Sequence, residues 1–337
     1  MNDLSATSVS EIAQERIEAF ADRIVAIRKH LHQVVVGQDE TIDLLLVCSL
    51  TGSHALLVGV PGLAKTLMVK ALASVFDWKF SRIQFTPDLM PSDITGYELL
   101  SRDQQTGTPT MTFRPGPVFA NLVLADEINR AAPKTQSALL EAMAEQHVTV
   151  GGQTYVMEDP FLVVATQNPI EQEGTYPLPE AQLDRFMMEI RLSYPSAEQE
   201  EEIVMKTAGH APALPAASLD RAMFLALRDV VRAVPVAPSV ASYAVRLCRA
   251  SRPEGRDGLP FVHQYVSWGA GPRGSQNLVL GAKARALLSG RTTPTTADVE
   301  ALALPILRHR VLPNHRAVSD GVTAEKIVEQ LLAEANR

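Results

Sequence analysis

Gly59-Val60-Pro61-Gly62-Leu63-Ala64-Lys65-Thr66 is the stretch that decides the fold, because it follows an apolar run, Ala55–Val58, and opens a helical pattern. A strand, a loop of small residues and a helix in this order are typical of a phosphate-binding P-loop. Small residues let backbone N–H groups turn toward a phosphate, Lys65 adds positive charge, and the Thr66 hydroxyl can ligate Mg²⁺. The strict pattern has glycine at position 64, where this chain has alanine. The loop alone favours nucleotide binding and leaves a chance glycine-rich turn as the alternative.

Two adjacent carboxylates follow a second apolar run about sixty residues later. The run Leu122–Ala125 leads directly into Asp126 and Glu127. Charged groups at the end of a buried strand are costly unless they face a metal ion or a polar site. Asp126 is therefore predicted to hold the Mg²⁺ shell, and Glu127 to orient and polarise an attacking water. The alternative is a strand that emerges into solvent with two ordinary surface acids.

A third apolar run, Phe161–Ala165, leads into Thr166-Gln167-Asn168-Pro169. Asn168 is then placed to hydrogen-bond the γ-phosphate or the lytic water from a neighbouring strand. Taken alone this signal is weak, because the same four residues also make a good turn.

Apolar runs that alternate with helical patterns between residues 40 and 170 predict an α/β fold with a parallel, doubly wound sheet. Two stretches, Tyr97–Phe113 and His147–Val156, read as β-hairpins inserted into this core. Helical patterns dominate after Tyr194-Pro195 and predict an all-helical domain. The expected organisation is a flexible N-terminus at residues 1–15, an α/β core at 16–195, a linker at 196–217 and the helical domain at 218–337.

The composition is that of an ordinary globular protein, with 337 residues, 46% hydrophobic residues and a formal net charge of −7. The acidic balance argues against a general polyanion binder, and the densest basic spots are Arg28–His30 and Arg308–Arg310. Cys48 and Cys248 lie far apart among apolar neighbours, which predicts two reduced core thiols. The chain has no signal-peptide layout at its start and no uninterrupted membrane span, so we expect a cytoplasmic location.

Read together, these segments resemble AAA+ ATPases, and their wording is closest to the MoxR family. The resemblance covers roughly residues 20–335. It rests on the P-loop and on six further motifs, which are Val36–Gln38, Phe85–Gly96, Phe113–Pro117, Asp126–Ala131, Thr166–Pro169 and Leu178–Phe186. It implies that residues 16–195 form an ATPase core and that residues 218–337 form a helical lid.

The resemblance implies roles for individual residues. Lys65 and Thr66 correspond to the Walker A motif, Asp126 and Glu127 to the Walker B motif, and Asn168 to sensor 1. The residues expected to contact the nucleotide are Gly37, Gln38, Gly59, Pro61, Gly62, Leu63, Ala64, Lys65, Thr66, Leu67, Asp126 and Arg273. For Gly37 and Gln38, which the family places beside the adenine, an ordinary turn is an equal candidate.

Two arginines have implied roles at a subunit boundary. Arg185, in Leu183-Asp184-Arg185-Phe186, matches the arginine finger that reaches the nucleotide of the next subunit, where a guanidinium neutralises phosphate charge. The alternative for Arg185 is a salt bridge with Asp184 or Glu180. Arg273 occupies the sensor 2 position at the start of a lid helix, and whether it acts within its own subunit stays open.

The function implied by the resemblance is ATP hydrolysis to ADP and phosphate, with Mg²⁺, in a homo-oligomer expected to be a hexameric ring. Such a ring would remodel a client protein, often with a von Willebrand factor A-domain partner, and Tyr97, Leu99 and Met111 of the first hairpin would face the client. These three side chains could instead only cap the sheet edge. The rival functions are a nucleic-acid motor, a metal-chelatase ATPase subunit and a nucleotide-gated binding module with little turnover.

Overall fold

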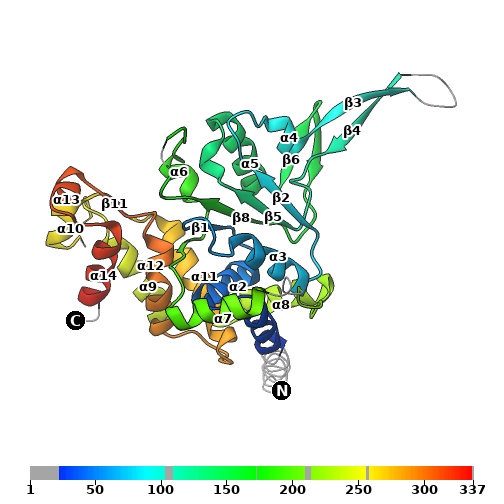
Figure 1. Cartoon of the computed structure of the whole chain (residues 1–337). Coiled ribbons are helices and arrows are strands. Elements are labelled where there is room, and N and C mark those ends of the chain that lie inside the picture. The colour runs from blue at the N-terminus through cyan, green and yellow to red at the C-terminus, as the bar shows by residue number, and fades with distance from the viewer. Residues whose placement is uncertain (1–22, 103–108, 172, 209–213, 256–257, 336–337) are drawn as a thin grey trace, which may run out of the picture.

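A five-stranded parallel sheet forms the centre of the computed structural model, which describes residues 23–102, 109–171, 173–208, 214–255 and 258–335 (Figure 1). The strand order is β2-β5-β8-β1-β9, and all four neighbouring pairs are parallel. The strands are β1 (Ala55–Val58), β2 (Phe80–Gln84), β5 (Leu122–Asp126), β8 (Leu162–Gln167) and β9 (Met188–Arg191). The predicted parallel α/β core is confirmed.

Both faces of the sheet are covered. Successive side chains of a strand point to opposite faces, so Leu57 and Leu124 join one hydrophobic cluster while Leu56 and Val123 join another. The first cluster includes α2 (Asp39–Thr51), α3 (Lys65–Val75) and the C-terminal helices; the second includes α5 (Pro133–Glu145). A further helix precedes α2 at residues 23–34. The N-terminal segment 1–15 lies outside the described residues.

Both predicted hairpins are present. Their strands are β3 (Gly96–Arg102) with β4 (Pro109–Pro115), and β6 (His147–Val150) with β7 (Gln153–Val156). The first hairpin follows α4 (Pro91–Thr95) and projects from the body of the molecule (Figure 1). The Phe113 ring stacks on the Tyr155 ring, which joins the bases of the two hairpins. Tyr97, Leu99 and Met111 are exposed on the first hairpin.

The C-terminal part is helical, with one exception to the all-helical prediction. A two-stranded pair, β10 (Val266–Trp268) with β11 (Leu312–Pro313), links two of its loops. The lid helices are α8 (Arg221–Ala233), α9 (Pro238–Ala250), α10 (Pro260–Tyr265), α11 (Pro272–Leu288), α12 (Thr296–Leu307), α13 (His315–Ser319) and α14 (Ala324–Ala335). The strand pair is three residues against two, too short to leave an alternating pattern in the sequence.

The segment predicted as a linker, 196–217, contains a helix, α7 (Ala197–Thr207). Ser196 begins it with a capping box, because its hydroxyl accepts from the N–H of Gln199 while the Gln199 side chain accepts from the N–H of Ser196. An Ala- and Pro-rich stretch, Ala211–Ala217, follows α7 in the sequence.

The lid and the α/β core share one hydrophobic cluster rather than two. Phe224 of α8 packs edge-on against Phe76 and Trp78, with ring centroids 5.0 and 4.6 Å away. Arg228 of α8 also donates two hydrogen bonds to the Asp159 carboxylate, at 2.7 and 2.5 Å. Cys48 and Cys248 are buried and free, as predicted. Within the described residues, no helix is both long and apolar enough to cross a membrane.

Candidate functional site

The P-loop connects β1 to α3, as the sequence predicts. Gly62 and Ala64 both adopt positive φ, at 90° and 57°, so the loop turns sharply before the helix begins at Lys65. No side chain caps the N-terminus of α3. Its first backbone N–H groups and the helix dipole therefore form a site suited to an anion.

Lys65 lies between this loop and the acidic strand end. Its ammonium group donates hydrogen bonds to the carbonyl oxygens of Gly59 and Val60. Partial burial lowers the pKa of Lys65, and the nearby carboxylates of Asp126 and Glu127 oppose that shift. The predicted Walker A lysine and Walker B acids therefore interact electrostatically within one chain.

Asp126 is the last residue of β5 and is only 9% exposed. Its Oδ1 accepts a 2.7 Å hydrogen bond from the Thr166 hydroxyl, and its Oδ2 accepts a 2.7 Å hydrogen bond from Arg82 Nη2. A buried carboxylate needs such partners, because removing an unpaired charge from water is expensive. Thr66, on the first turn of α3, is half-buried. A hydroxyl and a carboxylate oxygen are hard ligands that suit Mg²⁺.

Glu127 has a left-handed backbone, with φ of 56°, and starts a short 3₁₀ helix, η1 (Ile128–Arg130). Its N–H donates to the Thr166 hydroxyl at 2.8 Å. Its Oε2 accepts from Gln84 Nε2 at 3.1 Å and from Arg130 Nη1 at 2.9 Å. A non-glycine residue held at positive φ by several contacts is typical of functional sites.

Three residues in this arrangement are not predicted from the sequence. Thr166 contacts both acids, while Arg82 and Gln84 reach them from β2. Arg82 and Gln84 are two positions apart, so they share a face of their strand. That spacing indicates that the two side chains lie on one face of β2. Only the pairing of β2 with β5 shows that this face lies beside the acids.

Asn168 follows β8, the strand between β5 and β1, and is buried. The N–H of Gly59 donates to the carbonyl of Gln167 at 3.2 Å, which brings the start of the P-loop beside this turn. The side-chain oxygen of Asn168 accepts from the N–H of Ile170 at 3.1 Å. Its amide nitrogen is then the atom that can donate to a phosphate.

A cavity of about 160 Å³ lies beside the P-loop. Its walls come from the loop, the first turn of α3, the segment before α2, and α7; the lining residues include Val34, Val35, Val36, Gln38, Gly62, Leu63, Ala64, Leu67, Pro195, Ile203, Lys206 and Thr207. The Gln38 side chain donates to the carbonyl of Ser193 and accepts from Thr41, so its amide holds the wall together. Gly37 has φ of 75°, and a Cβ there would meet the Gln199 side chain.

Neither Arg185, the predicted arginine finger, nor Arg273, the predicted sensor 2 residue, lines that cavity. Arg185 follows α6 (Glu180–Leu183), and its Nη1 donates to the carbonyl of Leu140 at 3.0 Å. The alternative partner, Asp184, instead receives Arg273 Nη1 at 3.0 Å and Arg310 Nε at 2.7 Å. The structure thus places Arg273 next to the residue that precedes Arg185.

Comparisons with known proteins agree with this geometry. Residues 54–188 match the family model of the ATPase family associated with various cellular activities (AAA), and residues 261–331 match that of the AAA lid domain. The sequence is 41% identical to Chaperone MoxR1 of Mycobacterium tuberculosis, in a match spanning 97% of this chain and 86% of that protein. The chain belongs to the MoxR family of AAA+ ATPases. As a member it is a chaperone-like ATPase that binds and hydrolyses ATP.

Two further matches also extend over most of the chain. YeaC of Bacillus subtilis is 42% identical, in a match covering 90% of this chain and 92% of YeaC. A crystal structure of a Cytophaga hutchinsonii protein assigned as an ATPase superposes with a TM-score of 0.88 at 40% identity. That likeness covers 97% of this chain and 98% of the other, so it includes both the sheet and the lid.

Proposed function

We propose that this MoxR-family protein works as a closed ring, with six subunits expected, that uses ATP hydrolysis to remodel a partner protein complex. The observation that carries the proposal is the Thr166 hydroxyl, which fixes Asp126 and Glu127 together at the end of β5. This acid pair has the composition of a hydrolytic centre, with one carboxylate for a metal ion and one for water.

The residues divide the chemistry of hydrolysis between them. Backbone N–H groups at the start of α3 and the Lys65 ammonium bind the phosphates. Thr66 and Asp126 would hold Mg²⁺, which neutralises phosphate charge when bound. Glu127 accepts its two side-chain hydrogen bonds at Oε2, so Oε1 is the oxygen that would receive a proton from water. Asn168 would position that water or the γ-phosphate.

Arg185 is proposed to complete the site of the neighbouring subunit. A ring with head-to-tail contacts places the arginine of one subunit beside the nucleotide of the next. The ion pair from Arg273 to Asp184 supports a shared location for the two arginines at that boundary. The exposed side chains of the β3–β4 hairpin would contact a client, and the family analogy suggests a von Willebrand factor A-domain partner.

Steady-state phosphate release tests the enzymatic assignment. Glu127→Gln should abolish turnover while ATP still binds, and Arg185→Ala should lower turnover without weakening ATP binding. Unchanged hydrolysis in Glu127→Gln would refute the role of Glu127. The same inactive variant, loaded with ATP, is the natural bait for capturing the client and any A-domain partner.

A further inference from the structure

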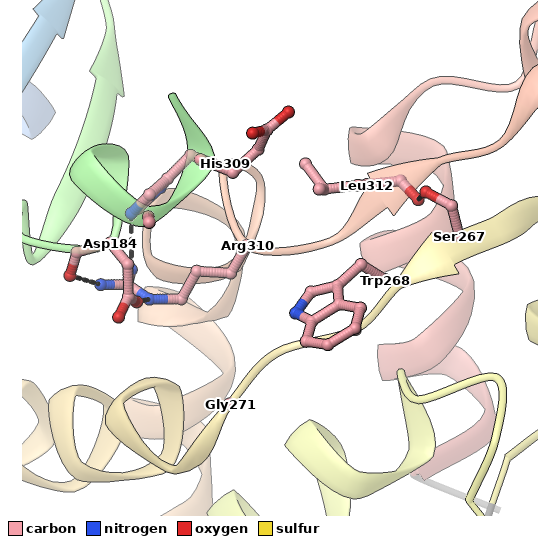
Figure 2. A pocket seen from close by; sticks show the side chains of 10 residues that line it. Asp184, Ser267, Trp268, Gly271, His309, Arg310 and Leu312 are labelled. Atoms are coloured by element: carbon pink, nitrogen blue, oxygen red, sulfur yellow. Dashed lines mark hydrogen bonds and ion pairs between the residues drawn. The ribbon is translucent and has the colours of Figure 1, made fainter. Parts of the chain in front are cut away.

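Arg310 is a buried arginine of the lid whose contacts lie mostly in the ATPase core. It follows α12 and is 5% exposed. Its Nε donates to Asp184 Oδ1 at 2.7 Å, and Figure 2 shows the two side chains facing each other beside α6. The cavity at this boundary, about 630 Å³, is lined by core residues such as Asp184 and by lid residues such as Trp268 (Figure 2).

Two of the other contacts of Arg310 stay within the lid, from Nη1 to the carbonyl of Ile306 and to His309 Nε2. The rest are with the backbone on either side of Arg185. Its Nη2 donates to the carbonyl oxygens of Asp184 at 3.1 Å and Phe186 at 2.8 Å, and its Nη1 donates to the carbonyl of Met187 at 3.0 Å. One guanidinium therefore holds the residue before Arg185 and the two residues after it. A lysine would place one compact ammonium there, without the planar fork that matches several acceptors at once.

Asp184 connects this buried contact to the surface. While Oδ1 pairs with Arg310, Oδ2 accepts from Arg273 at 3.0 Å. Arg310 and Arg273 belong to the lid, whereas Asp184 and Arg185 are consecutive residues of the core. Displacing the lid without this segment would leave a buried guanidinium and several carbonyls without partners, which is unfavourable.

We infer that Arg310 is a positioning residue that ties Arg185 to the helical lid. The position of the lid in one subunit then determines where the Arg185 side chain of that subunit lies relative to the nucleotide of the next. The inference rests on the trans role proposed for Arg185. A purely structural Arg310 would only hold the lid on the core, and its loss would damage the protein's own ATP site or its folding.

Subunit mixing separates these two roles. The test variant is Arg310→Lys, and Asp184→Asn provides an isosteric second variant that removes the same ion pair. Each is assayed alone and as an equal mixture with Glu127→Gln, which lacks turnover but keeps an intact finger. Arg185→Ala is the reference for a lost finger. Arg291→Lys is the matched control, because Arg291 makes a two-point ion pair with Asp298, at 2.7 and 2.5 Å, entirely within the lid.

Arg310→Lys should lower kcat by about tenfold or more while KM for ATP changes by less than about twofold. In the mixture, about half of the active sites that keep Glu127 have an intact finger beside them. These are about a quarter of all sites, so turnover should recover to about a quarter of the wild-type value. Turnover of the mixture of Arg185→Ala with Glu127→Gln should recover to the same extent. Arg291→Lys should keep wild-type kcat.

The inference would be overturned if turnover recovers in the mixture that contains Arg185→Ala but not in the mixtures that contain Arg310→Lys or Asp184→Asn. The proposed function would still stand in that case. If Arg185→Ala itself does not recover, the trans role is wrong and the inference falls with it. If the thermal transition shows that Arg310→Lys does not fold, the Asp184→Asn mixture is the test. Recovered turnover in that mixture supports the inference, and no recovery overturns it.

Discussion

The Thr166 hydroxyl donates a 2.7 Å hydrogen bond to Asp126 Oδ1 and accepts the N–H of the next residue, Glu127, at 2.8 Å. One fully buried hydroxyl on β8 thereby sets the orientation of both acids on β5. A threonine can do this because its single oxygen both donates and accepts. The orientation of the two acidic residues thus depends on a residue of the neighbouring strand.

Replacing Thr166 with valine should lower kcat by about 10- to 100-fold, the usual cost of removing a group that orients a reacting residue. Valine keeps the shape but leaves a buried carboxylate oxygen and a buried N–H without partners, so unfolding free energy should fall by about 1–3 kcal/mol. Phosphate release and chemical denaturation measure the two effects. Thr166→Ser keeps the hydroxyl and should retain most activity; equal losses in both variants would contradict the role of the hydroxyl.

The sequence predicted the P-loop, the acid pair and both hairpins because each is contained in a short segment with its own spacing. It did not predict the partners of Asp126, because Arg82 is 44 positions away and reaches it only through the pairing of β2 with β5. The basic spot at Arg308–Arg310 gave no sign that Arg310 is buried. Its acceptors are mainly backbone carbonyls, which any sequence supplies.

Ala64 illustrates a conflict between the sequence and the local backbone. Its φ of 57° lies in the left-handed region, where a Cβ costs about 1–2 kcal/mol relative to glycine. Glycine also gains entropy in the unfolded chain, which offsets part of that strain. Ala64→Gly should therefore raise the unfolding free energy by roughly 0.5–1 kcal/mol. Chemical denaturation at fixed protein concentration provides the measurement.

The control for this substitution is Ala301→Gly, because Ala301 is exposed in the middle of α12. There glycine should lower the unfolding free energy by about 1 kcal/mol, the ordinary helix-propensity cost. Opposite signs at the two positions are expected, and a loss of stability at both would mean that the P-loop is not strained at Ala64.

His54 should make the protein less stable in mild acid. Its Nδ1 accepts from the N–H of Val163 at 3.0 Å, so the ring proton lies on Nε2, which contacts the carbonyl of Met143 at 3.2 Å. Burial lowers the pKa of His54 from its ordinary 6.5 to about 4. Between these two pKa values the imidazole is protonated in the unfolded chain and neutral in the folded chain. The unfolding free energy therefore falls as pH falls, by roughly 3 kcal/mol at pH 4.

Denaturation curves collected from pH 7 to pH 4 test this effect of His54. His54→Asn keeps an acceptor for Val163 but has no titrating group, so its unfolding free energy should depend less steeply on pH. The variant should be less stable than wild type at pH 7, because the contact with Met143 is lost. Parallel pH profiles for the two proteins would show that other groups, and not His54, govern the acid response.

Lid and core should unfold together, with Phe224 contributing to the stability of both. Because its ring lies against Phe76 and Trp78 in a cluster shared by both parts, Phe224→Ala should lower the unfolding free energy by about 3–5 kcal/mol and keep one transition. Phe224→Leu, which preserves most of the volume, should cost less than about 1.5 kcal/mol.

The two tryptophans allow this cooperativity to be measured directly. Trp78 is buried against Phe224, whereas Trp268 is exposed in the lid. In a Trp268→Phe background, fluorescence reports Trp78 alone, while circular dichroism reports the helices of both parts. Coincident transitions by the two probes are expected for wild type and for Phe224→Ala, because a shared core cannot be lost from one side only. If the helical signal of the lid melts before Trp78 is exposed, lid and core are separate folding units despite their common cluster.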